Sequence, residues 1–210
     1  MDYVPLLAAV SFVGLLSVAV FVCEVPPQVD ASGEAVLAWV KANEQAIGTQ
    51  TWLGAVAWLP GAMLFTRAYC RMRGVTAASY LLGVALSMIL IFFGGMLRLG
   101  LMRHASDLTA GEARLVADIE ANWGPLATIG NILQAGALAV AVRQKQFVPW
   151  LFPVSLMFAA EQSIETVTIM KSGDIWGPGG LVNLAGSALY LVWVLAIGVG
   201  LSWADKSDPR

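Results

Sequence analysis

The side chains best placed to do chemistry in this sequence are carboxyl and amide groups inside one apolar segment. The run FVPWLFPVSLM is followed directly by FAAEQSIETVTIMKSGD, so Glu161, Gln162 and Glu165 fall within a hydrophobic stretch. Residues four apart share one face of a helix, which places Glu161 beside Glu165. Gln162 and Thr166 form the adjacent row. A charged side chain in hydrocarbon costs at least about 2.5–3.5 kcal/mol, so we expect these groups to face protein or water.

Other apolar segments carry polar groups at a similar depth: Arg98, Asn131, Gln134 and Asn183. We expect all of them to point toward one another in the interior of a helical bundle. Arg98 is then the natural counter-charge for Glu161 or Glu165, because a bidentate guanidinium–carboxylate pair offsets much of the cost of burial. With two carboxyls and one arginine, the second carboxyl is a candidate to exchange a proton or to bind a ligand.

Two other interpretations of these polar residues stay open. Hydrogen bonds between membrane helices can hold a bundle together without any ligand, at about 0.6 kcal/mol each. Alternatively, the side chains near a segment end can extend to the headgroups and have no special role. The sequence does not choose among a site, structural bonding and interfacial exposure.

Several classes of function find no support. A net charge of −2 without a basic stripe argues against nucleic acid as a partner. The chain has one histidine, His104, and two acidic residues four apart are a poor transition-metal site without histidine, so we expect no metal and no cofactor. No nucleotide-binding, zinc-protease or hydrolase motif is present, and nothing specific indicates an enzyme.

The composition defines the elements that must position these groups. Charged residues make up 12% of the chain, about half the share in a soluble domain, and the mean hydropathy is +0.73. A span of the hydrocarbon core needs about 20 apolar residues. We therefore predict an all-α, polytopic membrane protein, a single bundle over residues 1–210. Its six expected transmembrane helices are 4–23, 50–69, 76–102, 123–142, 147–170 and 180–203.

Basic residues in the connections predict the orientation of the bundle. One side of the membrane collects seven of them: Arg67, Arg71, Arg73, Arg143, Lys145, Lys206 and Arg210. The opposite connections hold five, diluted by nine acidic residues. Loops rich in Lys and Arg stay on the cytoplasmic side of a membrane, so both termini are expected in the cytoplasm. The two long outer loops each predict a short amphipathic helix, over 31–46 and 110–122, and Thr109 with Glu112 forms a capping box in the second.

The layout of the spans and the loop VPPQVDASGEAVLAWVKAN resemble a family of uncharacterised bacterial integral membrane proteins, chiefly actinobacterial. The resemblance implies a six-span bundle in a bacterial plasma (inner) membrane. It implies no activity and transfers no site residues.

Three functions are therefore expected from different classes. The leading one is the binding of a small or amphiphilic molecule in a polar pocket in the outer half of the membrane, with proton-coupled transport as one version. The second is an accessory or structural subunit of a larger membrane complex. The third is an intramembrane enzyme that modifies lipids or isoprenoids. The expected partners are membrane lipids, a small-molecule or lipid ligand, and a membrane protein partner or a second copy in a homodimer.

Overall fold

The computed structural model describes residues 2–27, 31–167 and 180–204 of the chain. Over these ranges the elements are all helices: α1 Val4–Val22, α2 Gly33–Ala42, α3 Glu44–Arg71, α4 Gly74–His104, α5 Ala110–Arg143, α6 Leu151–Glu165 and α7 Leu181–Ala204. The described residues contain no strand. The all-α prediction is confirmed for this part of the chain.

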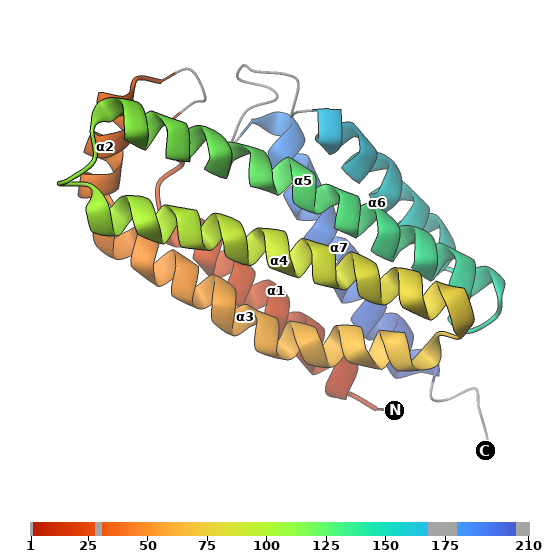
Figure 1. The fold of residues 1–210 in the computed structure, drawn as a ribbon. Helices are drawn as coiled ribbons and strands as arrows, with labels where there is room; N and C mark the ends of the chain where they lie inside the picture. The colour runs from red at the N-terminus through yellow and green to blue at the C-terminus, as the bar shows by residue number, and fades with distance from the viewer. Residues whose placement is uncertain (1, 28–30, 168–179, 205–210) are drawn as a thin grey trace.

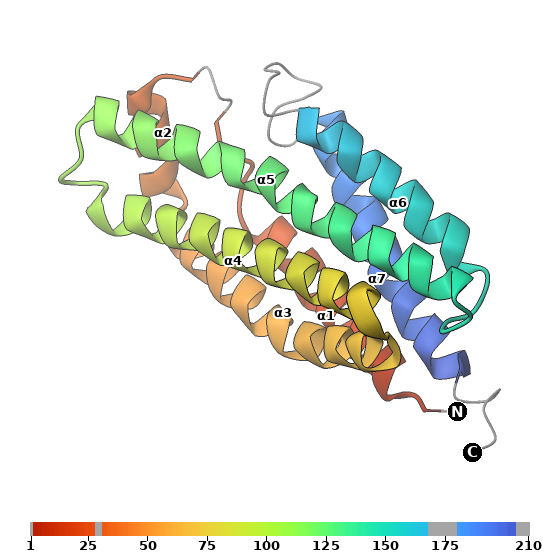
Figure 2. The same cartoon turned by 45° about the vertical axis from the view of Figure 1, so that its right-hand side comes forward.

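The long helices form a closed ring in which each packs against two neighbours. The order around the ring is α1, α3, α4, α5, α6, α7 and back to α1. Consecutive helices run in opposite directions, and α4 and α5 lie side by side along most of their length (Figures 1 and 2). The start of α1 and the end of α7 lie at one end of the bundle, called here the termini end. The short helix α2 lies at the opposite end, called here the α2 end.

Aromatic side chains fill the interior between α1, α3, α6 and α7. Phe12 is fully buried and its ring lies 5.6 Å from that of Trp58 in an edge-to-face arrangement. Phe158 stacks on Trp193 with 4.7 Å between ring centroids, and the Trp193 indole donates a hydrogen bond to Ser155. Large rings of this kind bury much apolar area and prefer these two geometries, so they fix how the helices are rotated.

Two glycines bring α4 and α5 together. A Cβ atom on Gly83 would lie 2.6 Å from the carbonyl oxygen of Gly130, a contact that no side chain tolerates. Small residues permit this close backbone approach in membrane bundles. The approach places Ser87, one turn along α4, directly against α5.

The helix α2 covers the α2 end of the ring. Ser32 caps its first turn by accepting a hydrogen bond from the Ala35 N–H. Val36 and Val40 then turn inward and pack in a second apolar cluster with Ile47 and Leu101.

Within the described ranges, four helices are long and apolar enough to cross a membrane: α1, α4, α5 and α7. The two remaining predicted spans lie in α3 and α6. The helix α6 is 15 residues long as described and begins at Leu151, and the predicted span 147–170 extends beyond the described residues. A short separate helix, α2, is found within the expected range 31–46. The other expected outer helix, 110–122, is the first part of the continuous 34-residue helix α5.

Candidate functional site

One turn of α6 brings two carboxyl groups onto a single amide. The Gln162 side chain is 1% exposed, and its Nε2 donates to Glu161 Oε2 at 2.8 Å and to Glu165 Oε2 at 2.9 Å. A carboxamide nitrogen carries two hydrogens, so both are used. Glu165 is buried, whereas Glu161 is partly exposed. The pairing of these carboxyls on one face of a helix is as the spacing predicts.

Hydrogen bonds continue from Gln162 into α5 and α4. Gln162 Oε1 accepts from Asn131 Nδ2 at 2.6 Å, and Asn131 Oδ1 accepts from the Ser87 hydroxyl at 2.9 Å. Ser87 in turn accepts from Gln134 Nε2 at 3.1 Å. Gln134 is 1% exposed, and its Oε1 has no hydrogen-bond partner among the described residues. Amide and hydroxyl groups on three helices therefore form one continuous chain.

The helix α7 completes the site from the other side. Asn183 Nδ2 donates to Glu165 Oε1 at 3.2 Å. A Cβ atom on Gly186 would lie 2.4 Å from Glu165 Oε2 and 2.8 Å from Glu161 Oε1. The two carboxyls thus lie against the backbone of α7, where only glycine leaves room for them. We call this set the inner polar network: Ser87, Asn131, Gln134, Glu161, Gln162, Glu165 and Asn183.

Two of the predicted site residues lie outside this network. The Thr166 hydroxyl donates to the Ser163 carbonyl of its own helix at 2.7 Å, which is a local bond at the end of α6. The expectation that Arg98 pairs with Glu161 or Glu165 is wrong. Its guanidinium donates to Gln50 of α3 and forms an ion pair with Glu120 of α5.

Arg98 belongs to a second cluster near the α2 end. We call it the outer ion-pair layer: Gln50, Arg98, Arg114, Asp118 and Glu120. Gln50 Nε2 donates to the Ala19 carbonyl at 3.1 Å, which ties the layer to α1. Arg114 binds Asp118 through two nitrogens and also donates to the Ala31 carbonyl just before α2. The layer therefore fastens α2 and its leading loop to the four helices beneath.

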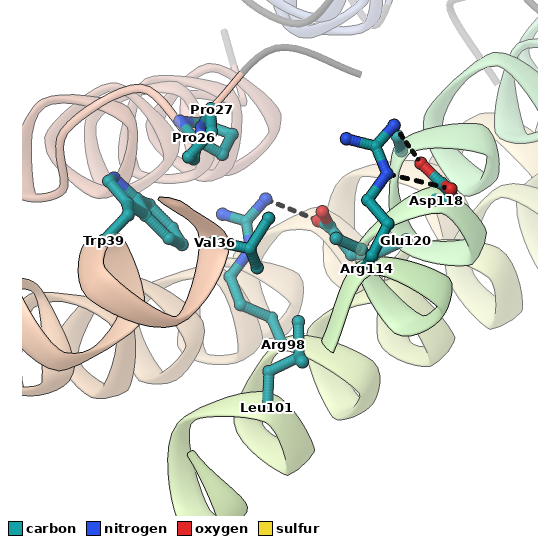
Figure 3. Close-up of a pocket in the computed structure, with 11 residues that line it drawn as sticks. Pro26, Pro27, Val36, Trp39, Arg98, Leu101, Arg114, Asp118 and Glu120 are labelled. Carbon is teal, nitrogen blue, oxygen red and sulfur yellow. Dashed lines mark hydrogen bonds and ion pairs between the residues drawn. The ribbon is translucent and has the colours of Figure 1, made fainter. Parts of the chain in front are cut away.

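A small cavity lies between this layer and α2 (Figure 3). Pro26, Pro27, Val36 and Trp39 line one side, and Arg98, Glu120, Arg114 and Asp118 approach from α4 and α5. The Trp39 indole nitrogen is buried with no hydrogen-bond partner in the described part of the chain. The cavity volume is about 30 Å³, which is about one water molecule. This space suits a bridging water and is too small for an amphiphile.

Five members of these clusters are absent from the predicted site residues: Ser87, Gln50, Arg114, Asp118 and Glu120. Ser87 follows Gly83 by four residues in an apolar segment, and that small-residue spacing is typical of a helix contact. Gln50 is the first residue of the predicted span 50–69, and Glu120 lies in the predicted outer helix 110–122. Both lie on helices that continue into predicted spans, so one face of each helix had to be covered by protein.

No group of three or more His, Cys, Asp and Glu side chains that could hold a metal ion occurs among the described residues. No protein-family model, no curated protein and no solved structure matches the chain. The geometry of the two polar clusters is therefore the basis for a functional proposal.

Proposed function

We propose that this multi-pass membrane protein binds a small or amphiphilic molecule at the carboxyl end of the inner polar network. The observation that carries the proposal is the direction of the hydrogen bonds. The two N–H groups of the Gln162 amide on α6 point at Glu161 and Glu165, and Asn183 adds a third donor from α7. Two carboxyls held together in this way form an acceptor site.

The chemistry of such a site selects its ligand. Carboxyl oxygens accept hydrogen bonds and, when ionised, attract cations, so the ligand must offer N–H or O–H groups or a positive charge. Glu161 is the partly exposed member and is the group that a ligand would meet first. Carboxyls also take up and release protons, which is the basis for the proton-coupled version of the proposal.

In this proposal six helices cross the membrane: the four long apolar helices, together with α3 and α6. In this arrangement both termini face the cytoplasm of a bacterial cell and the α2 end faces outward. The carboxyl pair, near the end of α6 and the start of α7, then lies in the outer half of the bilayer.

The test is a binding measurement with three probes of equal chain length: decylammonium, decanol and decyl sulfate. The full chain is reconstituted in nanodiscs, and binding is followed by isotope-edited infrared difference spectra of labelled glutamate carboxyls. Decylammonium is expected to bind best and to change the carboxyl bands. Glu165→Gln should weaken its binding about ten-fold or more, since a hydrogen bond to a charged group contributes about 1.5–3 kcal/mol.

Glu44→Gln is the matched control, because Glu44 is an exposed glutamate at the start of α3. It removes the same carboxyl group without touching the network. The proposal fails if Glu161→Gln and Glu165→Gln bind all three probes as the wild type does and the carboxyl bands do not respond. In that case the network only holds α4 to α7 together.

A further inference from the structure

A groove runs between α4 and α5 on the bundle surface. Leu90 and Phe93 of α4 and Asp118, Ile119, Asn122 and Leu126 of α5 line it, and it encloses about 360 Å³. We call it the α4–α5 groove. Asp118 belongs to this groove and also to the small cavity under α2, whereas none of the inner polar network residues line it.

One end of the groove is polar. The Asp118 side chain is 41% exposed and is held by Arg114, with Nε at 3.1 Å from Oδ2 and Nη2 at 2.8 Å from Oδ1. Each carboxylate oxygen can accept a second hydrogen bond, so Arg114 orients the group without filling it. Asn122 Nδ2 donates to the Asp118 backbone carbonyl at 2.8 Å, which keeps the Asn122 side-chain amide at the polar end of the groove. The polar end therefore presents oxygen acceptors and a carboxylate charge.

The rest of the groove is apolar. Phe93, Ile119 and Leu126 are between 40% and 50% exposed, and Leu90 is partly buried. Leu126 lies eight residues from Asp118, or about 12 Å along the helix. Phe93 and Leu126 belong to the predicted spans 76–102 and 123–142, so in a bilayer that α4 and α5 cross this part of the groove faces hydrocarbon. A polar end toward α2 and an apolar floor toward the middle of the bundle match a molecule with one head and one chain.

We infer that the α4–α5 groove binds a phospholipid with a primary ammonium headgroup, of the ethanolamine type, from the leaflet at the α2 end. An ammonium group brings three N–H donors and a positive charge to the Asp118 carboxylate. A choline headgroup has the charge but no N–H donor, and the carboxylate repels a purely anionic headgroup. The inference does not depend on the function proposed for the inner polar network.

Photo-crosslinking of the full chain in phosphatidylcholine nanodiscs tests this inference. A minor fraction of the lipid carries a photoreactive acyl chain and an ethanolamine, choline or glycerol headgroup, and mass spectrometry locates the crosslinks. The ethanolamine probe should label Leu90, Phe93 and Leu126 about two- to ten-fold more than the choline probe, which is the range for the one net hydrogen bond that choline cannot make. Asp118→Asn should abolish this preference.

Two further variants guard against indirect effects. Asn122→Leu leaves the Arg114–Asp118 pair intact and should reduce the preference for ethanolamine. Asp107→Asn removes an exposed carboxylate in the turn before α5 and should change nothing. Equal labelling by ethanolamine and choline probes, stronger labelling by the anionic glycerol probe, or a preference that survives in Asp118→Asn would each overturn the inference. Absence of labelling in the groove by all three probes, as when another protein covers it, would also overturn the inference.

Discussion

The ion pair between Arg98 and Glu120 gives the sharpest test of how the helices are placed against one another. The Arg98 side chain is 19% exposed and that of Glu120 is 11% exposed, and Gln50 Oε1 accepts a second bond from Arg98 at 2.7 Å. Replacing Glu120 by glutamine leaves a mostly buried guanidinium with neutral acceptors. Replacing Arg98 by methionine leaves the carboxylate mostly buried instead. Either single change should lower the free energy of unfolding.

The depth of burial of the pair determines how much free energy of unfolding is lost when one partner is removed. Removing one partner of a fully buried pair costs about 3–5 kcal/mol, whereas exposed pairs contribute about 0.2–1 kcal/mol. Because roughly a fifth of Arg98 remains exposed, we expect Glu120→Gln to destabilise by about 2 kcal/mol. The Arg114–Asp118 pair, with side chains 25% and 41% exposed, serves as the reference and should give about 0.5 kcal/mol.

Two double-mutant cycles measure the coupling by equilibrium unfolding in mixed micelles, followed by circular dichroism. The cycle of Arg98→Met with Glu120→Gln should give a coupling of about 2 kcal/mol. The cycle of Arg98→Met with Glu165→Gln should be additive within about 0.5 kcal/mol, because the two groups share no partner shown by the structure. A larger coupling of Arg98 to Glu165 than to Glu120 would refute the placement of Arg98 in the outer ion-pair layer.

Three further predictions concern the ends of the bundle. Gly33→Ala should release α2, because the new Cβ would meet the Ala110 carbonyl oxygen at 1.8 Å; hydrogen exchange of α2 amides should accelerate while the long helices stay protected. Thr109→Ala removes the capping box of α5 and should cost about 0.5–2 kcal/mol in unfolding experiments, a loss that the serine variant should largely restore. A backbone N–H at the start of α1 and the Arg67 guanidinium hold the pKa of Asp2 below its ordinary value. Its stabilisation is therefore complete above about pH 4 and is lost as pH falls through the lowered value, so Asp2→Asn should flatten the acid limb of a stability–pH curve.

The sequence predicted the pairing within α6 correctly because it depends on local geometry alone. Glu161 and Glu165 are four residues apart, so their shared face follows from the helical period, and Gln162 lies in the adjacent row. Asn131 and Asn183 also joined the network as expected, since each lies at the matching depth of a neighbouring helix. The prediction for Arg98 was wrong because its level was misjudged. Arg98 lies eleven residues beyond Ser87 on α4, about 16 Å along the helix, and meets Glu120 near the α2 end.

The length and character of a helix and its placement against its neighbours are set by different parts of the chain. Hydropathy and length determined by themselves that the chain is helical and that several helices can cross a membrane. Which polar residues meet depends on how each helix is turned toward its neighbours. That rotation is decided only in the tertiary structure, by the Gly83–Gly130 approach between α4 and α5 and by the aromatic packing around Phe12. These contacts join residues far apart in the sequence, which is why the sequence alone did not place Arg98 beside Glu120 or Glu165 beside the amides of Gln162 and Asn183.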